Sequence, residues 1–382
     1  MAASEALGIK GLHSIHYFVS EAERSARFYQ QAFGWQAAWQ ATPELVARGR
    51  QTSTVYQAGD IRVAVSTPVG EGGRAWRYLR RHPAGIGTLN FEVEDLDAAY
   101  AFLAERGGTF VHGIQTSHLP DGGRYRDFVI TTAIGDVAFR FCERRDTQVF
   151  APGFEALPTT SDNPLGFGAV DHITSNAQTM ASVGLWFEHV LGMERYWGIE
   201  FHTEDVKHGG ETGTGLRSIV YWDPRSGLKF PINEPLSPFF KEGQINRFIE
   251  DNAGAGVQHI ALQVADVVES VRTLRQRGIA FLETPGSYYD QAPARLLPLG
   301  VDVQHIAHDL NVLRELGILI DGSPDDRYLI QIFLKDAMTL YNEPQAGPFF
   351  FELIQRCGDP GFGGGNFRAL FEAIEREQLG EP

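Results

Sequence analysis

Three residues in the second half of the sequence carry side chains that can bind a metal ion. His172 and His259 lie near the starts of apolar segments predicted as strands, and Glu352 interrupts an apolar run. An ionised carboxylate in a buried strand is costly unless a positive group or a hydrogen-bond donor meets it. Two imidazoles and one carboxylate are the ligand set of mononuclear non-haem iron(II) sites with open coordination positions. The spacing alone does not distinguish iron from manganese, zinc or cobalt.

A structural role is the alternative for each of these residues taken singly, because a histidine or glutamate at a strand end is usually a hydrogen-bonded core residue. The string VQHIA also occurs twice, at 257–261 and 303–307. Only the first copy leads into a strand, a turn and a helix that match the internal repeat described below. We therefore take His259 as the ligand and expect His305, which precedes a helical pattern, in a loop at the surface.

The segment around Glu352 has the features of a pocket. The run 349–354 predicts a strand buried on both faces, and a glycine-dense loop carrying Phe362 follows at 361–365. An amphipathic helix then closes the chain, with apolar residues at helical spacing: Phe367, Leu370, Phe371 and Ile374. We expect the strand, the loop and the helix to form the floor, rim and cover of a pocket. The glycines at 363–365 would be the hinge of a mobile cover.

The chain repeats itself at about half its length, which predicts two similar domains. Segments 11–34 and 169–192 share a strand with a histidine, a polar turn, a helix and a closing glycine. Further on, Asp95 aligns with Asp266 and Gly107 with Gly278. Each half would consist of two modules in which a strand and a helix lead into further strands, an α+β architecture. The weakly periodic segment 151–165 suggests a boundary between domains 1–155 and 156–382. The glycine-rich segment 204–215 is predicted to connect strands at the surface.

The repeat also serves as an internal control for the metal hypothesis. The residues that correspond to the three candidate ligands, allowing a small gap for the first, are His16, Thr88 and Arg140. The first half therefore lacks two of the three ligands. We interpret the second half as the half with the site, and the first half as a scaffold.

Composition excludes several classes of protein. The chain has 382 residues, a formal net charge of -15 and two cysteines, and its acidic and basic residues are interspersed. Nucleic acids and anionic membranes favour a concentrated basic surface, so neither is an expected partner. We find no secretion signal and no apolar stretch long enough to span a membrane. Two cysteines fit a reducing compartment, so we expect a cytoplasmic protein without a disulfide scaffold or a thiolate zinc site.

Several motifs between residues 169 and 378 together give a specific resemblance. They are AVDHI, LRSIVYWDP, FPINEP, GVQHIAL, YLIQIF, FFFELIQR and GFGGGNFRALFEAIEREQ. In these strings the second half resembles the 4-hydroxyphenylpyruvate dioxygenases of the vicinal oxygen chelate superfamily. The first half resembles them mainly in architecture.

The resemblance implies a fold, a cofactor and a reaction. The fold is two similar domains of paired βαβββ modules, each an open curved sheet with helices outside, plus a C-terminal helix over the pocket. The cofactor is Fe(II), held by His172, His259 and Glu352. The reaction converts 4-hydroxyphenylpyruvate and O2 into homogentisate and CO2 by oxidative decarboxylation, ring hydroxylation and side-chain migration, a step of tyrosine catabolism. Members of the family assemble as dimers or tetramers, which implies a homo-oligomer.

The resemblance also implies a set of pocket residues. The polar members that match the family are Ser218, Asn233, Gln244, Gln258 and Gln331. Their neutral groups can orient a phenol and a carboxylate without competing for the metal. The aromatic members are Phe333, Phe350, Phe362 and Phe367, with Pro231 and Phe371 completing the wall. Asn366 has two interpretations at this stage, as the cap of the last helix or as a hydrogen-bonding group of the pocket.

Three other functions compete with this interpretation. A 4-hydroxymandelate synthase shares the fold, metal and substrate, although Pro231 and Phe333 are of the homogentisate-forming type. A non-catalytic, ligand-sequestering protein of the same superfamily would not need two histidines and a glutamate. An extradiol ring-cleaving dioxygenase commonly has a further acid–base histidine, for which His305 is poorly placed.

Overall fold

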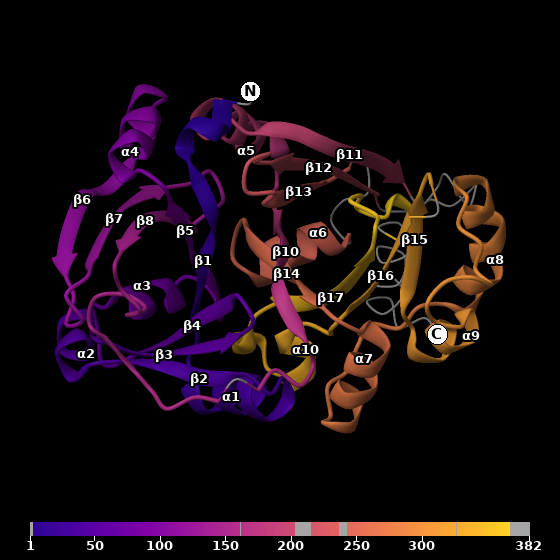
Figure 1. Ribbon diagram of the computed structural model, residues 1–382, viewed down its shortest axis with the longest axis horizontal. Helices are drawn as coiled ribbons and strands as arrows, with labels where there is room; N and C mark the ends of the chain where they lie inside the picture. Colours follow the sequence, from indigo (N-terminus) through magenta and orange to yellow (C-terminus); the bar gives the residue numbers. More distant parts are fainter. Residues whose placement is uncertain (1–2, 161, 203–214, 237–242, 326, 367–382) are drawn as a thin grey trace.

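Two curved sheets lie side by side in the computed structural model, and each is built from one half of the chain (Figure 1). The structure describes residues 3–160, 162–202, 215–236, 243–325 and 327–366. In these residues no helix is long and apolar enough to cross a membrane. Both cysteines, Cys142 and Cys357, are free.

The two sheets have the same strand order, apart from one additional edge strand in the first. In the described residues the first sheet runs β6 (Phe110–His118), β7 (Arg124–Thr131), β8 (Ala138–Arg145), β5 (Gly85–Val93), β1 (Ile9–Phe18), β4 (Ile61–Pro68), β3 (Gln51–Ala58), β2 (Gln36–Ala41) and β9 (Phe154–Ala156). The second sheet runs β11 (Glu194–His202), β12 (Gly215–Trp222), β13 (Lys229–Pro235), β10 (Phe167–Asn176), β14 (Gly256–Val264), β17 (Phe350–Cys357), β16 (Arg327–Phe333) and β15 (Leu319–Ser323). Reading each sheet in chain order gives two βαβββ modules per half, as predicted.

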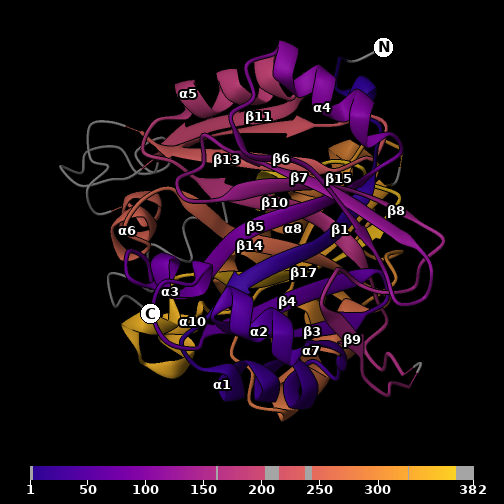
Figure 2. The ribbon, with the colours of Figure 1, turned by 90° about the vertical axis from the view of Figure 1, so that its left-hand side faces the viewer.

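Helices lie on the outer sides of the sheets, most visibly α4 on one half and α7, α8 and α9 on the other (Figures 1 and 2). Their bounds are α1 (Ala22–Ala26), α2 (Pro43–Gly49), α3 (Arg74–Leu79), α4 (Leu96–Glu105), α5 (Met180–Leu185), α6 (Gln244–Asp251), α7 (Val267–Gln276), α8 (Gly286–Leu296), α9 (Leu310–Leu316) and α10 (Ala337–Tyr341). Helices α1 and α5 continue as π-helical turns at Arg27–Ala32 and Trp186–Val190.

The aligned residues of the repeat have the same local roles in both halves. Asp95 caps α4 by accepting a hydrogen bond from the backbone of Ala98, and Asp266 caps α7 in the same way. Gly107 and Gly278 follow these helices with φ of +82° and +83°. That conformation favours glycine and ends a helix, so these two short signals located both helices correctly from the sequence.

The strand registers correct one predicted correspondence. Thr88 on β5 pairs with His16, whereas His259 on β14 pairs with Thr174. The counterpart of His172 is therefore Ser14, two residues before His16. The expected match of His172 with His16 is therefore wrong, because it needs a gap that the strand registers do not contain. The first half thus lacks all three candidate ligands, not two.

The two halves share an apolar core where their central strands meet. The ring of Phe351 on β17 lies 5.6 Å from that of Phe33, and Phe139 lies 6.1 Å from Phe230. Backbone also approaches backbone closely here. A Cβ on Gly347 would come within 2.0 Å of the carbonyl oxygen of Ala84, so this site requires glycine. The interface fixes β17, and with it the position of Glu352.

Candidate metal centre

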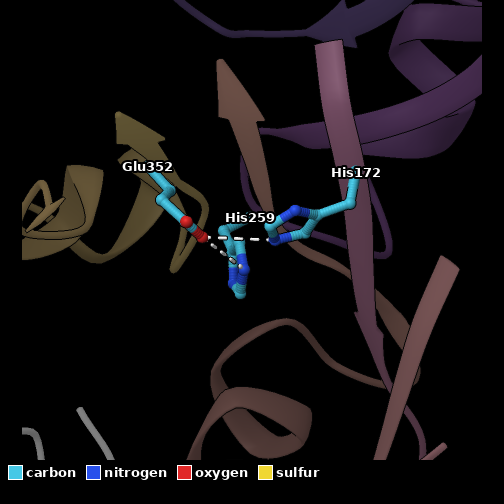
Figure 3. Close-up of side chains that lie close together, drawn as sticks. All are labelled: His172, His259 and Glu352. Carbon is cyan, nitrogen blue, oxygen red and sulfur yellow. Dashed lines mark ion pairs between the residues drawn. The ribbon is translucent and has the colours of Figure 1, made fainter. Parts of the chain in front are cut away.

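The side chains of His172, His259 and Glu352 converge on one point (Figure 3). The Nε2 atoms of His172 and His259 lie 3.2 Å and 3.4 Å from Oε2 of Glu352. One ligand atom from each residue lies within 4.8 Å of the other two, and all three residues are buried. Of the described residues, no other group of three or more His, Cys, Asp or Glu side chains converges in this way. The cluster can hold a metal ion.

Strand register brings the three residues together from distant parts of the sequence. They lie on β10, β14 and β17, which are neighbours in the second sheet. His172 pairs with Ala261, and Ala261 in turn pairs with Glu352 on the other side of β14. Paired residues point to the same face of a sheet, so the histidine of β10 and the glutamate of β17 share a face. His259, two residues before Ala261, joins them on that face.

Both histidines are oriented by a side chain that the chain places directly before them. Nδ1 of His172 lies 2.9 Å from a carboxylate oxygen of Asp171, and Nδ1 of His259 lies 3.1 Å from the amide oxygen of Gln258. Both partners are acceptors, so each Nδ1 carries the proton and donates it. The Nε2 atom of each ring then faces Glu352, and it can bind a metal once it carries no proton, as in many histidine–metal sites.

Asp171 is itself held by a buried network that the sequence interpretation missed. Its two carboxylate oxygens accept hydrogen bonds from Nε and Nη2 of Arg356, at 2.6 Å and 2.7 Å, and Gln263 donates a third at 3.0 Å. Burial would raise the pKa of Asp171, but Arg356 and His172 hold it well below its usual range. Arg356 also donates to the backbone oxygens of Asp359 and Gly361, both at 2.7 Å, and so ties the glycine-rich loop to the metal centre. The sequence feature that could have indicated this network is the aspartate directly before His172.

Electrostatics make the centre a place for a cation. Burial would raise the pKa of Glu352, but His172 and His259 lower it, so the carboxylate is charged. Burial would lower the pKa of His172, but Glu352 and Asp171 raise it to about 9. Burial lowers the pKa of His259, which stays neutral. In the described residues Oε1 of Glu352 is buried without a hydrogen-bond partner. An orphaned carboxylate oxygen is costly, and a metal ion would satisfy it.

The predicted polar residues lie on the strands beside the centre or at its edge. Ser218 on β12 pairs with Asn233 on β13, and both are buried. Within the described part of the chain, Oγ of Ser218 and Oδ1 of Asn233 have no hydrogen-bond partner. Gln331 is buried on β16, on the face of Glu352 by register. The unpartnered atoms of Ser218 and Asn233 are available to hydrogen-bond to a bound molecule.

A hollow of about 450 Å³ lies behind two residues that contact His259, and none of the three candidate ligands lines it. It is lined by Gln244 at the start of α6 and by Gln258, two of the predicted substrate residues, together with Phe350. Arg247 and Asp251 of α6 also line it. Its volume is in the range of small-molecule sites.

Aromatic rings cover the two imidazoles. Phe350 stacks on His259 with ring centroids 5.0 Å apart and an interplanar angle of 22°, and Phe333 lies 5.9 Å away at 76°. Phe362 of the glycine-rich loop lies 5.1 Å from His172. Pro231 belongs to β13 and pairs with Val220. The predicted aromatic residues that the structure describes therefore do surround the cluster.

Asn366 is buried inside the first turn of the last helix, so it is not the cap. Its Oδ1 accepts a hydrogen bond from Tyr288, whose hydroxyl also bonds Arg295. The backbone N–H of Gly365 donates to Asp321 at 2.8 Å. Tyr288, Arg295 and Asp321 had no local signal in the sequence, because contacts between distant segments create their role.

Some predictions fall outside the described residues, namely Phe367, Phe371, the rest of the terminal helix and nearly all of the segment 204–215. His305 was predicted correctly. Its side chain is exposed, lies 3.0 Å from Asp302 and takes no part in the centre.

Comparison with known proteins identifies the family. A model of the glyoxalase/bleomycin resistance protein/dioxygenase superfamily matches residues 11–127 and 169–294, one region in each half. The 4-hydroxyphenylpyruvate dioxygenase of Dictyostelium discoideum is 31% identical, with 97% of this chain and 98% of that protein covered. The enzyme of the same name from Caenorhabditis briggsae is 34% identical, with 95% and 91% covered. The chain belongs to the 4-hydroxyphenylpyruvate dioxygenase family. It is an enzyme of that family, and the predicted resemblance is confirmed.

Two solved structures are similar to this chain in fold. A triple mutant of 4-hydroxymandelate synthase from Streptomyces coelicolor superposes with a TM-score of 0.79 at 26% identity, covering 97% of this chain and 99% of that one. A fusion of a xylose isomerase-like TIM barrel with 4-hydroxyphenylpyruvate dioxygenase gives 0.69 at 17% identity, covering 97% of this chain and 53% of that one. The latter likeness concerns the fold alone. Because the chain belongs to this family, its enzyme class is that of a dioxygenase.

Proposed function

We propose that this dioxygenase converts 4-hydroxyphenylpyruvate and O2 into homogentisate and CO2, with a ferrous ion held by His172, His259 and Glu352. The observation that carries the proposal is the convergence of these three side chains, with one oxygen of Glu352 left without a partner among the described residues. Two imidazoles and one carboxylate suit ferrous iron with open positions. When bound, the ion supplies the redox chemistry of oxygen activation.

Residues beside the centre would bind and orient the substrate. Ser218 and Asn233 present a hydroxyl and an amide oxygen whose hydrogen bonds are unmet among the described residues. Gln331 lies on the same face of the sheet as Glu352. Such neutral groups hydrogen-bond to a phenol or a carboxylate and leave the metal to the charged ligands. We assign the recognition of the two ends of the substrate to these residues and to Gln244 and Gln258.

The aromatic residues would exclude water from the site of the reaction. Phe333, Phe350 and Phe362 are buried and lie against the imidazoles. A closed apolar wall excludes water, which would otherwise compete for reactive species, and it provides flat surfaces for the substrate ring. From the sequence we propose that Phe367 and Phe371 complete this wall, next to Asn366, which accepts a hydrogen bond from Tyr288.

An oxygen-electrode assay with product analysis tests this proposal. The protein is reconstituted with ferrous ion, given 4-hydroxyphenylpyruvate, and its products are separated by chromatography. We expect one homogentisate and one CO2 for each O2 consumed. Oxygen uptake without homogentisate, or no uptake at all with ferrous ion present, would refute the assignment.

A 4-hydroxymandelate synthase is the second candidate, because a structure of that enzyme aligns over almost the whole chain. The curated relatives at 31–34% identity carry the dioxygenase name, which favours homogentisate. Phe333 pairs with Glu352 across β16 and β17, so it is placed to influence where a ring near the centre sits. Hydroxymandelate as the main product of the assay would establish this second function instead.

A further inference from the structure

The first half of the molecule contains a second hollow, of about 540 Å³, with a strongly basic lining. Four arginines of α3 and the residues directly after it line the hollow, namely Arg74, Arg77, Arg80 and Arg81. Asp136 is the acidic residue among the lining residues. This concentration of positive charge stands out in a chain whose formal net charge is -15.

The internal repeat relates this hollow to the one beside the metal centre. Gly73 precedes α3 and Gly243 precedes α6, and each helix leads into a central strand, β5 or β14. Aligning the two glycines gives four equivalent pairs in the two linings: Arg74 with Gln244, Arg77 with Arg247, Tyr78 with Phe248, and Arg81 with Asp251. The basic hollow is therefore the first half's counterpart of the hollow of about 450 Å³ that Gln244 and Gln258 line.

The charge of the hollow is not neutralised by the protein. Asp136 pairs with Arg81, with Nη1 and Oδ2 3.3 Å apart. In the described part of the chain, Arg74, Arg77 and Arg80 form no ion pair with a carboxylate. The counterpart hollow contains one arginine, Arg247, with acidic residues beside it. The two hollows therefore suit different ligands.

Two of the guanidinium groups are held in place before any ligand binds. Nη2 of Arg74 donates to the backbone oxygen of Gly87 at 2.9 Å and to the hydroxyl of Thr88 at 3.2 Å. The guanidinium of Arg80 lies over the ring of Trp76, 4.8 Å from its centroid. Preorganised groups lose less entropy on binding. Guanidinium groups also bind phosphate and carboxylate oxygens in a two-point manner.

We propose that this basic hollow is a binding site for a small molecule that carries two or more oxyanion groups. Phosphate esters and polycarboxylates share this chemistry, and the lining does not favour one over the other. The site is separate from the hollow of about 450 Å³, because it lies in the first half of the chain and shares no lining residue with that hollow. It explains why a half without metal ligands keeps an open hollow at the equivalent position.

Calorimetric titration of the full-length, iron-loaded protein tests the proposal. One titration uses fructose 1,6-bisphosphate and the other uses tricarballylate, at about 0.1 M salt because charged contacts are screened at higher salt. We expect saturable binding of at least one of them, with one site per chain. Binding of the bisphosphate alone would identify phosphate groups as the ligand, and binding of tricarballylate alone would identify carboxylates.

Two charge-matched variants locate the site. The double variant Arg77→Gln/Arg80→Gln removes two charges from the hollow, whereas Arg48→Gln/Arg272→Gln removes two charges elsewhere on the exposed surface. We expect the first to weaken binding at least tenfold and the second to change it less than twofold. Both should keep the thermal unfolding transition and the dioxygenase activity of the unmodified protein. Absence of saturable binding to either anion, or equal affinities in the two double variants, would overturn the proposal.

Discussion

Glu352 shows how far a single functional side chain depends on its neighbours. It is buried in an apolar strand, where an ionised carboxylate alone would be strongly destabilising. The positive charge of His172 and the neighbouring imidazole of His259 keep its pKa low, and a metal ion would satisfy the carboxylate oxygen that has no partner among the described residues. The sequence indicated this carboxylate because it interrupts a run of phenylalanines. It did not indicate Asp171 and Arg356, which orient His172 from outside the ligand set.

The Asp171→Asn variant tests that outer support. The substitution keeps the size of the side chain but removes the charge that pairs with Arg356 and accepts from His172. We expect the affinity for ferrous ion to fall by about 10–100-fold, because partners of this kind orient and polarise the ligand. Competition with a chelator measures the affinity.

The matched control for this variant is Asp223→Asn, since Asp223 is a buried carboxylate bonded to Ser4, away from the centre. It should leave the metal affinity unchanged. An Asp171→Asn protein that binds iron as tightly as the unmodified protein would show that the support is not needed.

His16 is predicted to make stability depend on pH. Burial, together with Arg140 and Arg74, lowers its pKa from 6.5 to about 3, so the imidazole is neutral in the folded protein. Below about pH 6.5 the unfolded chain binds a proton that the folded protein does not. The free energy of unfolding should therefore fall as the pH is lowered from about 6.5 toward 3, by about 1.4 kcal/mol per pH unit from this residue.

The variant His16→Gln isolates this contribution, because glutamine can still hydrogen-bond to Ser66 but does not titrate. Urea unfolding between about pH 4.5 and 6 should show a shallower loss of stability in the variant. Parallel pH dependences of the two proteins would argue against a neutral His16 in the folded protein.

At the scale of elements, β17 connects the interface with the metal centre. Phe351 packs into the first half, whereas Phe350 and Glu352 face the centre. This alternation follows from the period of two along a strand. It explains why the sequence pattern here suggested burial on both faces, and why the position of Glu352 depends on how the two halves fit together.

The Gly347→Ala variant measures how tightly that fit is constrained. Gly347 has φ of +84°, and an added Cβ would come within 2.0 Å of the oxygen of Ala84. Gly107 has φ of +82° with no atom within 4 Å of such a Cβ, which makes Gly107→Ala the control. We expect the control to cost about 1–2 kcal/mol for its positive φ. Gly347→Ala should cost about 1–3 kcal/mol more, because of the clash and because Gly347, with ψ of 157°, lies outside the left-handed helical region. If chemical denaturation shows equal losses of stability in the two variants, the interface can rearrange to accept the added Cβ.

The sequence predicted elements with strong local signals and missed relationships that depend on register. Aspartates before helices and glycines after them marked α4 and α7 correctly, because caps are local. The counterpart of His172 was misplaced by two residues, because residue identity was preferred to strand pairing. The hydrogen bond between Tyr288 and Asn366 joins segments that no local pattern relates.

At the scale of the whole molecule, the two halves share a topology but not a chemistry. Equivalent strands meet in the same order, and equivalent glycines approach equivalent alanines across the interface: Gly135 against Ala255, and Gly347 against Ala84. The second half has two histidines and a glutamate where the first has Ser14, Thr88 and Arg140. The repeat therefore contains its own comparison between a half with the three candidate ligands and a half without them.

That comparison gives the most direct test of the metal centre. Ferrous ion binding is measured anaerobically for the unmodified protein, for His259→Ala and for Thr88→Ala, which changes the equivalent position in the first half. We predict one ion per chain in the unmodified protein and in Thr88→Ala, and loss of that ion in His259→Ala with the fold retained. Undiminished binding in His259→Ala, or loss of the ion in Thr88→Ala, would contradict the assignment of the metal to the second half.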